Sequence, residues 1–147
     1  MAFDLDASAF PLVLVRWTGC ATAEIFESFF DAHDALRERA RTHASALVTI
    51  HDARLALPPD AAARDVATAR VGRTRVMPGV MDIVVTDHPG VRGVITALGW
   101  VLPGPMKNVM TAPDLATAYQ LARTAFAAHK QPAPEPPPWA KGGPPAL

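Results

Sequence analysis

Residues 46–52 read Ala-Leu-Val-Thr-Ile-His-Asp, a nearly continuous apolar run that ends in two polar side chains. A short apolar run without alternating polar residues is typical of a strand that is covered on both faces. We therefore predict a central, buried strand over residues 46–50, with His51 and Asp52 at its carboxyl end.

Strand-like and helix-like segments alternate on both sides of this run. Short stretches rich in β-branched and aromatic side chains predict strands, and longer stretches with apolar side chains at helical spacing predict helices. Strands are expected at residues 10–17, 46–50, 82–87 and 107–110, and helices at residues 22–40, 60–71, 91–102 and 114–129. Because parallel strands need crossover connections, this order predicts a single α/β domain: a mixed or mainly parallel sheet of four to five strands, with helices packed against it.

The end of the chain has a different composition from the rest. Residues 131–147 are rich in proline and glycine and show no periodicity. Such a segment is expected to form a disordered or extended tail that adds nothing to the core. The predicted domain therefore covers residues 1–130.

The overall composition restricts the classes of partner. Half of the residues are hydrophobic, and 14 basic residues balance 14 acidic ones, so no net field attracts nucleic acid. The single cysteine, Cys20, cannot form an internal disulfide, and the first residues lack the basic character of an export signal. No apolar run is long enough to cross a bilayer. We expect a cytoplasmic protein that binds no nucleic acid and does not insert into membranes.

Two stretches carry a resemblance to a known family. Residues 47–52, Leu-Val-Thr-Ile-His-Asp, are similar to the strand that leads into that family's signature loop. Residues 108–119, Asn-Val-Met-Thr-Ala-Pro-Asp-Leu-Ala-Thr-Ala-Tyr, are similar to its terminal strand and helix. Together with the order of elements over residues 11–129, they resemble the STAS/SpoIIAA-like superfamily, bacterial proteins with the fold of anti-sigma factor antagonists.

The resemblance implies a non-enzymatic regulatory or scaffolding domain that acts in signalling by protein–protein binding, and it leaves a homodimer open. Members that work as phosphorylation switches carry Ser or Thr just after an Asp, whereas Asp52 is followed by residues 53–59, Ala-Arg-Leu-Ala-Leu-Pro-Pro. We therefore expect no such switch. Some related folds hold lipids, so the alternative is a carrier or sensor of an apolar or anionic, lipid-like small molecule.

Two groups of residues are candidates for binding. A set of arginines could bind an acidic protein partner through charge-assisted hydrogen bonds, although a solvated helix face has the same composition: Arg54, Arg64, Arg70, Arg73 and Arg75. The apolar side chains of Ile95, Leu98 and Trp100 could line a ligand pocket, or simply pack in the core.

The residues His51, Asp52, Asp87 and His88 form two His/Asp pairs, each at the expected carboxyl end of a strand. In open α/β sheets ligands often bind at that edge, so these pairs are weak candidates for a metal site. The alternative is that they cap turns and helices. Sequence motifs of hydrolases, phosphate loops and dinucleotide-binding folds are absent, so we expect neither an enzyme nor a cofactor.

Overall fold

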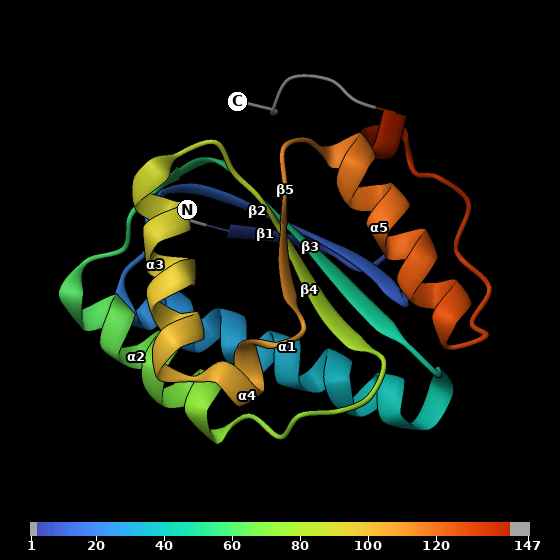
Figure 1. Cartoon of the computed structure of the whole chain (residues 1–147), viewed down its shortest axis with the longest axis horizontal. Coiled ribbons are helices and arrows are strands. Elements are labelled where there is room, and N and C mark those ends of the chain that lie inside the picture. Colours follow the sequence, from blue (N-terminus) through green and yellow to red (C-terminus); the bar gives the residue numbers. More distant parts are fainter. Residues whose placement is uncertain (1–2, 142–147) are drawn as a thin grey trace.

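A five-stranded mixed sheet forms the centre of the protein in the computed structural model, which describes residues 3–141 (Figure 1). The strands lie side by side in chain order, and all neighbouring pairs are parallel except the first, which is antiparallel. The prediction of a single α/β domain with a mixed, mainly parallel sheet is confirmed. The strands are β1 (Phe3–Asp6), β2 (Leu12–Cys20), β3 (Leu47–Leu57), β4 (Val80–Val85) and β5 (Val109–Ala112).

Helices cover both faces of the sheet. The connections from β2 to β5 all progress in the same direction across the sheet, and right-handed crossovers of this kind place their helices on the same face. The last helix follows β5 and packs on the opposite face (Figure 1). The helices are α1 (Ala23–His43), α2 (Ala61–Arg73), α3 (Pro89–Val101), α4 (Pro103–Met106) and α5 (Leu115–Ala128).

Helix starts agree with local capping chemistry. Thr22, Asp60 and Asp114 precede α1, α2 and α5, and each side chain accepts a hydrogen bond from a backbone N–H of the first turn. These bonds satisfy donors that have no partner inside the helix. The starts of α1, α2 and α5 are therefore each fixed by a single side chain.

The two faces of the sheet have separate cores. Because successive side chains of a strand point to opposite faces, Val48 and Ile50 of β3 pack in the cluster beneath α5, while Leu47 packs in the cluster beneath α1. The same alternation places Thr49 and His51 on the α1 side and Asp52 on the α5 side. His51 and Asp52 are neighbours in sequence but face different halves of the molecule.

Two features at the ends of the chain differ from the expectations. The edge strand β1, which the sequence pattern did not predict, pairs with β2 and brings Phe3 and Leu5 against the α1-side core. The proline-rich segment forms neither helix nor strand over residues 131–137 and then forms a short 3-10 helix, η1 (Pro138–Lys141).

The expectation that the proline-rich tail adds nothing to the core is wrong for the described part. The Tyr119 hydroxyl donates to the Pro134 carbonyl at 2.7 Å, and the Trp139 ring packs edge-on against Tyr119 with centroids 6.4 Å apart. Ala140 is buried in the same cluster. Proline costs little entropy to hold extended, so a few contacts with α5 suffice. The remainder of the predicted tail, residues 142–147, lies outside the described residues.

Among residues 3–141, no helix is both long enough and apolar enough to cross a membrane.

Candidate functional site

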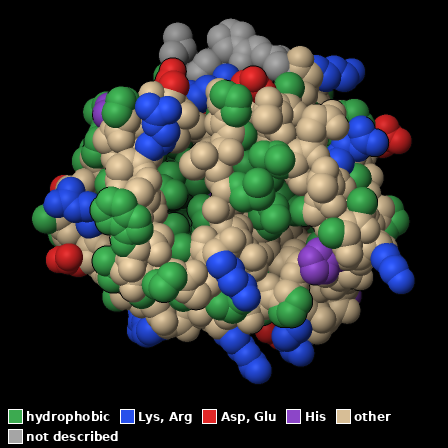
Figure 2. Space-filling view, in the orientation of Figure 1, with side chains coloured by type: hydrophobic (Ala, Val, Ile, Leu, Met, Phe, Trp, Pro, Cys, Tyr) green, Lys and Arg blue, Asp and Glu red, His purple; other side chains and the backbone are tan. Residues whose placement is uncertain are grey.

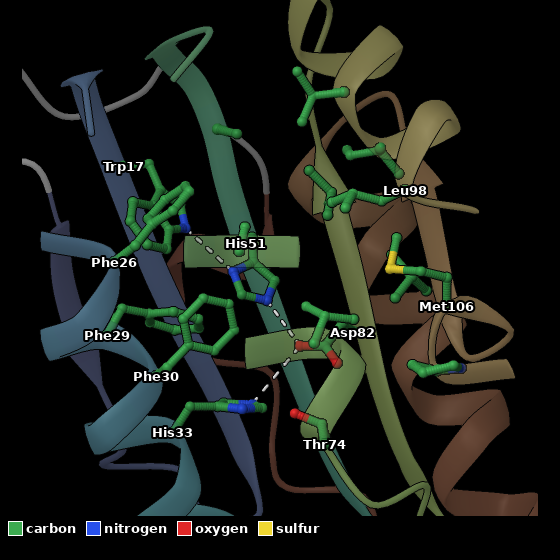
Figure 3. Close-up of a pocket in the computed structure, with 18 of the residues that line it drawn as sticks. Trp17, Phe26, Phe29, Phe30, His33, His51, Thr74, Asp82, Leu98 and Met106 are labelled. Atoms are coloured by element: carbon green, nitrogen blue, oxygen red, sulfur yellow. Dashed lines mark hydrogen bonds and ion pairs between the residues drawn. The ribbon is translucent and has the colours of Figure 1, made fainter. Parts of the chain in front are cut away.

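A cavity of about 260 Å³ lies over the β3–β4 part of the sheet and is lined by α1, α2, α3 and α4, with α1 on one side and α3 on the other (Figure 3). Its lining is mainly apolar. An apolar cavity of about 150 Å³ is enough to hold one benzene molecule, whereas drug-sized ligands occupy about 300 Å³ or more. The volume therefore suits a ligand with one ring or a short alkyl chain.

One wall of the cavity is aromatic. Phe26, Phe29 and Phe30 lie on one face of α1 because residues three and four apart are neighbours on a helix, and Trp17 of β2 packs among them. The Trp17 ring meets Phe29 and Phe26 edge to face, with centroids 4.9 and 5.6 Å away. Such contacts hold the rings in defined orientations, so this wall is preformed.

The opposite wall is provided by α3 and α4. Val91, Val94, Ile95 and Leu98 of α3 line the cavity, together with Met106 of α4. Although α3 contains one charged residue and is otherwise largely apolar, none of its 13 residues, all within the described range, is buried. An apolar helix normally buries its apolar stripe. Here that stripe faces the cavity instead of packed side chains.

Hydrophobic side chains are also visible from outside on this half of the protein. In the space-filling view they gather over α3 and beside the recess next to it (Figure 2). The cavity is therefore open to solvent on this side rather than sealed within the core.

A polar cluster, made of His33, Thr49, His51 and Asp82, lies at the sheet side of the cavity. Nε2 of His51 is 2.9 Å from Oδ1 of Asp82, and Nε2 of His33 is 3.7 Å from the same oxygen. Nε2 of His33 is also 3.0 Å from Oγ1 of Thr49. The parallel register places Thr49 directly beside Asp82, so helix α1 and strands β3 and β4 all contribute to the cluster.

The hydrogen bonds determine the tautomer of His51. The indole Nε1–H of Trp17 donates to Nδ1 of His51 at 3.1 Å, and an indole nitrogen can only donate (Figure 3). Nδ1 must therefore be the acceptor, and the ring proton lies on Nε2, which donates to Asp82. This arrangement requires a neutral imidazole, since a second ring proton would point at the indole N–H.

Charges in the cluster follow from burial and from these contacts. Burial lowers the pKa of His33, and the attraction of Asp82 only partly opposes that effect. Burial raises the pKa of Asp82, but the hydrogen bond from His51, together with the electrostatic influence of His33, His51 and Arg37, outweighs this effect and lowers the pKa overall. Near neutral pH the cluster thus carries one negative charge, on Asp82.

Asp82 is not fully coordinated by the protein. Both histidine contacts reach Oδ1, while Oδ2 accepts no hydrogen bond from any residue between 3 and 141. The Asp82 side chain retains 24% of its accessible surface, and Asp82 is one of the residues that line the cavity. At the outer edge Arg37 donates to the carbonyl of Arg75 rather than to Asp82.

The predicted pocket residues divide into two groups. Ile95 and Leu98 line the cavity, whereas Trp100 is 81% exposed and points into solvent. Trp100 follows Leu98 by two positions, and residues two apart do not share a face of a helix.

The two predicted His/Asp pairs do not form one site. His51 faces the cavity, while Asp52 lies on the opposite face and forms a bidentate pair with Arg54, with both N–O distances 2.8 Å. His88 accepts a hydrogen bond from the Gly90 N–H and so caps α3, and Asp87 is exposed. Among residues 3–141, His, Cys, Asp and Glu side chains form no group of three or more arranged to hold a metal ion.

The predicted arginine set does not form a single free surface either. Arg54 is paired with Asp52, and Arg70 forms ion pairs with three acids of α1, Glu27, Asp31 and Asp34. Arg64, Arg73 and Arg75 are exposed, and Arg75 also lies at the edge of the cavity.

Sequence reasoning missed Asp82 and His33 as site residues. Both could be recognised from the sequence, because each is a polar residue within an otherwise apolar pattern: Asp82 inside a strand and His33 inside the apolar stripe of α1.

Neither a comparison with protein-family models nor one with curated proteins gives a match to this chain.

Proposed function

We propose that the protein binds a small, mainly apolar molecule in the cavity between α1 and α3. The observation that carries this proposal is the state of α3, an apolar helix that buries none of its own described residues and faces an apolar cavity. Each square ångström of apolar surface removed from water contributes about 25 cal/mol, so a ligand that covers this face gains affinity from it. A role as a carrier or sensor of such a molecule accounts for the cavity.

The regulatory role expected from the STAS/SpoIIAA-like resemblance is the second candidate. Trp100 and Val101, at the end of α3, are 81% and 66% exposed, and exposed aromatic side chains are favoured at the centres of protein interfaces. A non-enzymatic, cytoplasmic bacterial binding module would use this surface for a protein partner. The two roles are compatible, because the same helix lines the cavity and carries Trp100.

Filling the cavity tests the first proposal. Leu98→Trp places a larger side chain in the cavity, and Ala97→Trp adds the same side chain at the neighbouring exposed position of α3. We expect an apolar fluorescent dye to bind the natural protein and the Ala97→Trp variant, and to bind the Leu98→Trp variant at least about tenfold more weakly. Equal binding to all three proteins would contradict the proposal.

Native mass spectrometry of the purified protein addresses the ligand itself. A retained small molecule, lost under denaturing conditions and absent from the Leu98→Trp variant, would support the carrier or sensor role.

The second candidate function, binding of a protein partner, is tested at Trp100. Trp100→Ala should abolish binding to a protein partner captured from bacterial extract, while dye binding stays unchanged because Trp100 points away from the cavity.

A further inference from the structure

We propose that the ligand carries a protonated amine on a small apolar body, and that Oδ2 of Asp82 receives this amine. The inference rests on the proposed function, since it concerns the same cavity. It adds the chemical class of the ligand, which the apolar lining alone does not determine.

The first step is the charge at the sheet side of the cavity. His51 is held as a neutral donor by Trp17, and no Lys or Arg side chain among the described residues pairs with Asp82 within ion-pair distance. Arg37 acts on the carboxylate from beyond ion-pair distance, so the protein offsets its charge only in part. A cation is attracted to this position, and a second anion is repelled.

The second step is the unfilled coordination of the carboxylate. An ionised carboxylate offers about four positions to donors, and in Asp82 both protein contacts are made by Oδ1. A ligand that displaces water from Oδ2 must replace its hydrogen bonds, or the buried charge is left unsatisfied. A protonated amine supplies both the donor and the opposite charge.

The third step is the aromatic wall. Trp17, Phe26, Phe29 and Phe30 line the cavity on the side of His51 (Figure 3). Aromatic ring faces attract cations, Trp most strongly, and the same rings pack well against an apolar body. A carboxylate beside aromatic rings is therefore suited to an amine attached to a ring or a short alkyl group.

The remaining charged groups around the cavity allow a competing result. Arg37, Arg75 and Asp34 lie at its edge. The guanidinium of Arg37 donates to the carbonyl of Arg75 and could attract an anionic ligand at the edge. A ligand with a cationic head group is favoured if that group lies at Asp82, and one with an anionic head group is favoured if it lies at Arg37. The experiment therefore compares cationic and anionic ligands.

Four single-ring probes share one body and differ in the head group: benzylamine, benzyl alcohol, toluene and benzoate. Binding to the natural protein is followed by the NMR shift of the Trp17 indole N–H, which reports on the bond to His51. Trp100→Phe and Trp139→Phe variants assign the three indole signals. We expect benzylamine to bind at least about tenfold more tightly than toluene, and benzoate to bind most weakly.

Asp82→Asn keeps the shape of the side chain and removes its charge. The tenfold preference for benzylamine over toluene should fall to about twofold or less in this variant, while toluene binds as before. Arg37→Gln is the matched control at the edge of the cavity, and it should leave the preference for benzylamine intact. If Asp82→Asn does not fold, the probe series on the natural protein still decides the question.

The outcomes separate the two proposals. Equal binding of benzylamine and toluene, or tightest binding of benzoate, would overturn the amine inference and leave the apolar cavity as a binding site. Failure of all four probes to bind, together with failure of the dye, would overturn the proposed function as well. A preference for benzylamine that survives Asp82→Asn would show that another group selects the amine and would refute the role of Asp82.

Discussion

His33 makes the stability of the protein depend on pH in a direction that can be worked out. Its pKa is lowered from 6.5 by burial in the folded protein, whereas the unfolded chain has the ordinary value. Below pH 6.5 the unfolded state therefore binds more protons, and the protein loses stability as the pH falls. For a histidine that stays neutral in the fold, the loss between pH 6.5 and 5.5 is about 1 kcal/mol, and it approaches about 1.4 kcal/mol per pH unit below that range.

Urea unfolding at both pH values, for the natural protein and for His33→Gln, measures this contribution. Glutamine can keep a hydrogen bond to Thr49 but cannot titrate, so the loss on acidification should be smaller in the variant, by up to about 1 kcal/mol. His43→Gln, at an exposed position of the same helix, is the control. If the attraction of Asp82 at 3.7 Å dominated instead, His33 would be protonated in the fold, and the natural protein would gain stability relative to His33→Gln on acidification. That sign would refute the reasoning.

Two further predictions concern the frame around the site. Gly79 has a φ of 80°, and a Cβ there would collide with the carbonyl oxygen of Ser45, so Gly79→Ala should destabilise the protein by about 1–3 kcal/mol in thermal or urea unfolding. Gly93→Ala, in open space on α3, should instead stabilise by about 0.5–1 kcal/mol, and an equal effect of both changes would contradict this account. Tyr119→Phe removes the hydrogen bond to Pro134 and should cost about 1 kcal/mol, with increased protease cleavage after residue 130; unchanged cleavage would show that this bond does not hold the segment.

Much of the fold could be predicted because its signals are local. All but the first residue of the apolar run at residues 46–50 belong to the start of the central strand β3, and Thr22 caps the start of α1. The edge strand β1 was missed because four residues reading Phe-Asp-Leu-Asp have too little apolar character to predict a strand. Its stability comes from pairing with β2, which is a contact between segments and not a property of either one.

Less of the candidate site could be predicted, for a similar reason. Ile95, Leu98 and His51 stand out in sequence, but the partner of His51 is Asp82, 31 positions away, and their meeting depends on the register between β3 and β4. His51 and Asp52 do not share a site, because adjacent residues of a strand face opposite sides of the sheet. The same alternation groups Thr49 with His51 and leaves Asp52 on the other face.

The two faces of the sheet differ in a way that bears on function. Beneath α5 large apolar side chains fill the core, and Phe126 is almost completely buried. Beneath α3 the same sheet carries two histidines, a carboxylate whose histidine contacts are both made by one oxygen, and an apolar cavity that the helix does not fill. A sequence that packs one face to completion could pack the other, and local departures from good packing and polar pairing are expected mainly at functional sites. Because the departures in packing, charge and helix burial coincide at one place, the α3 face is where we expect this protein to bind its ligand.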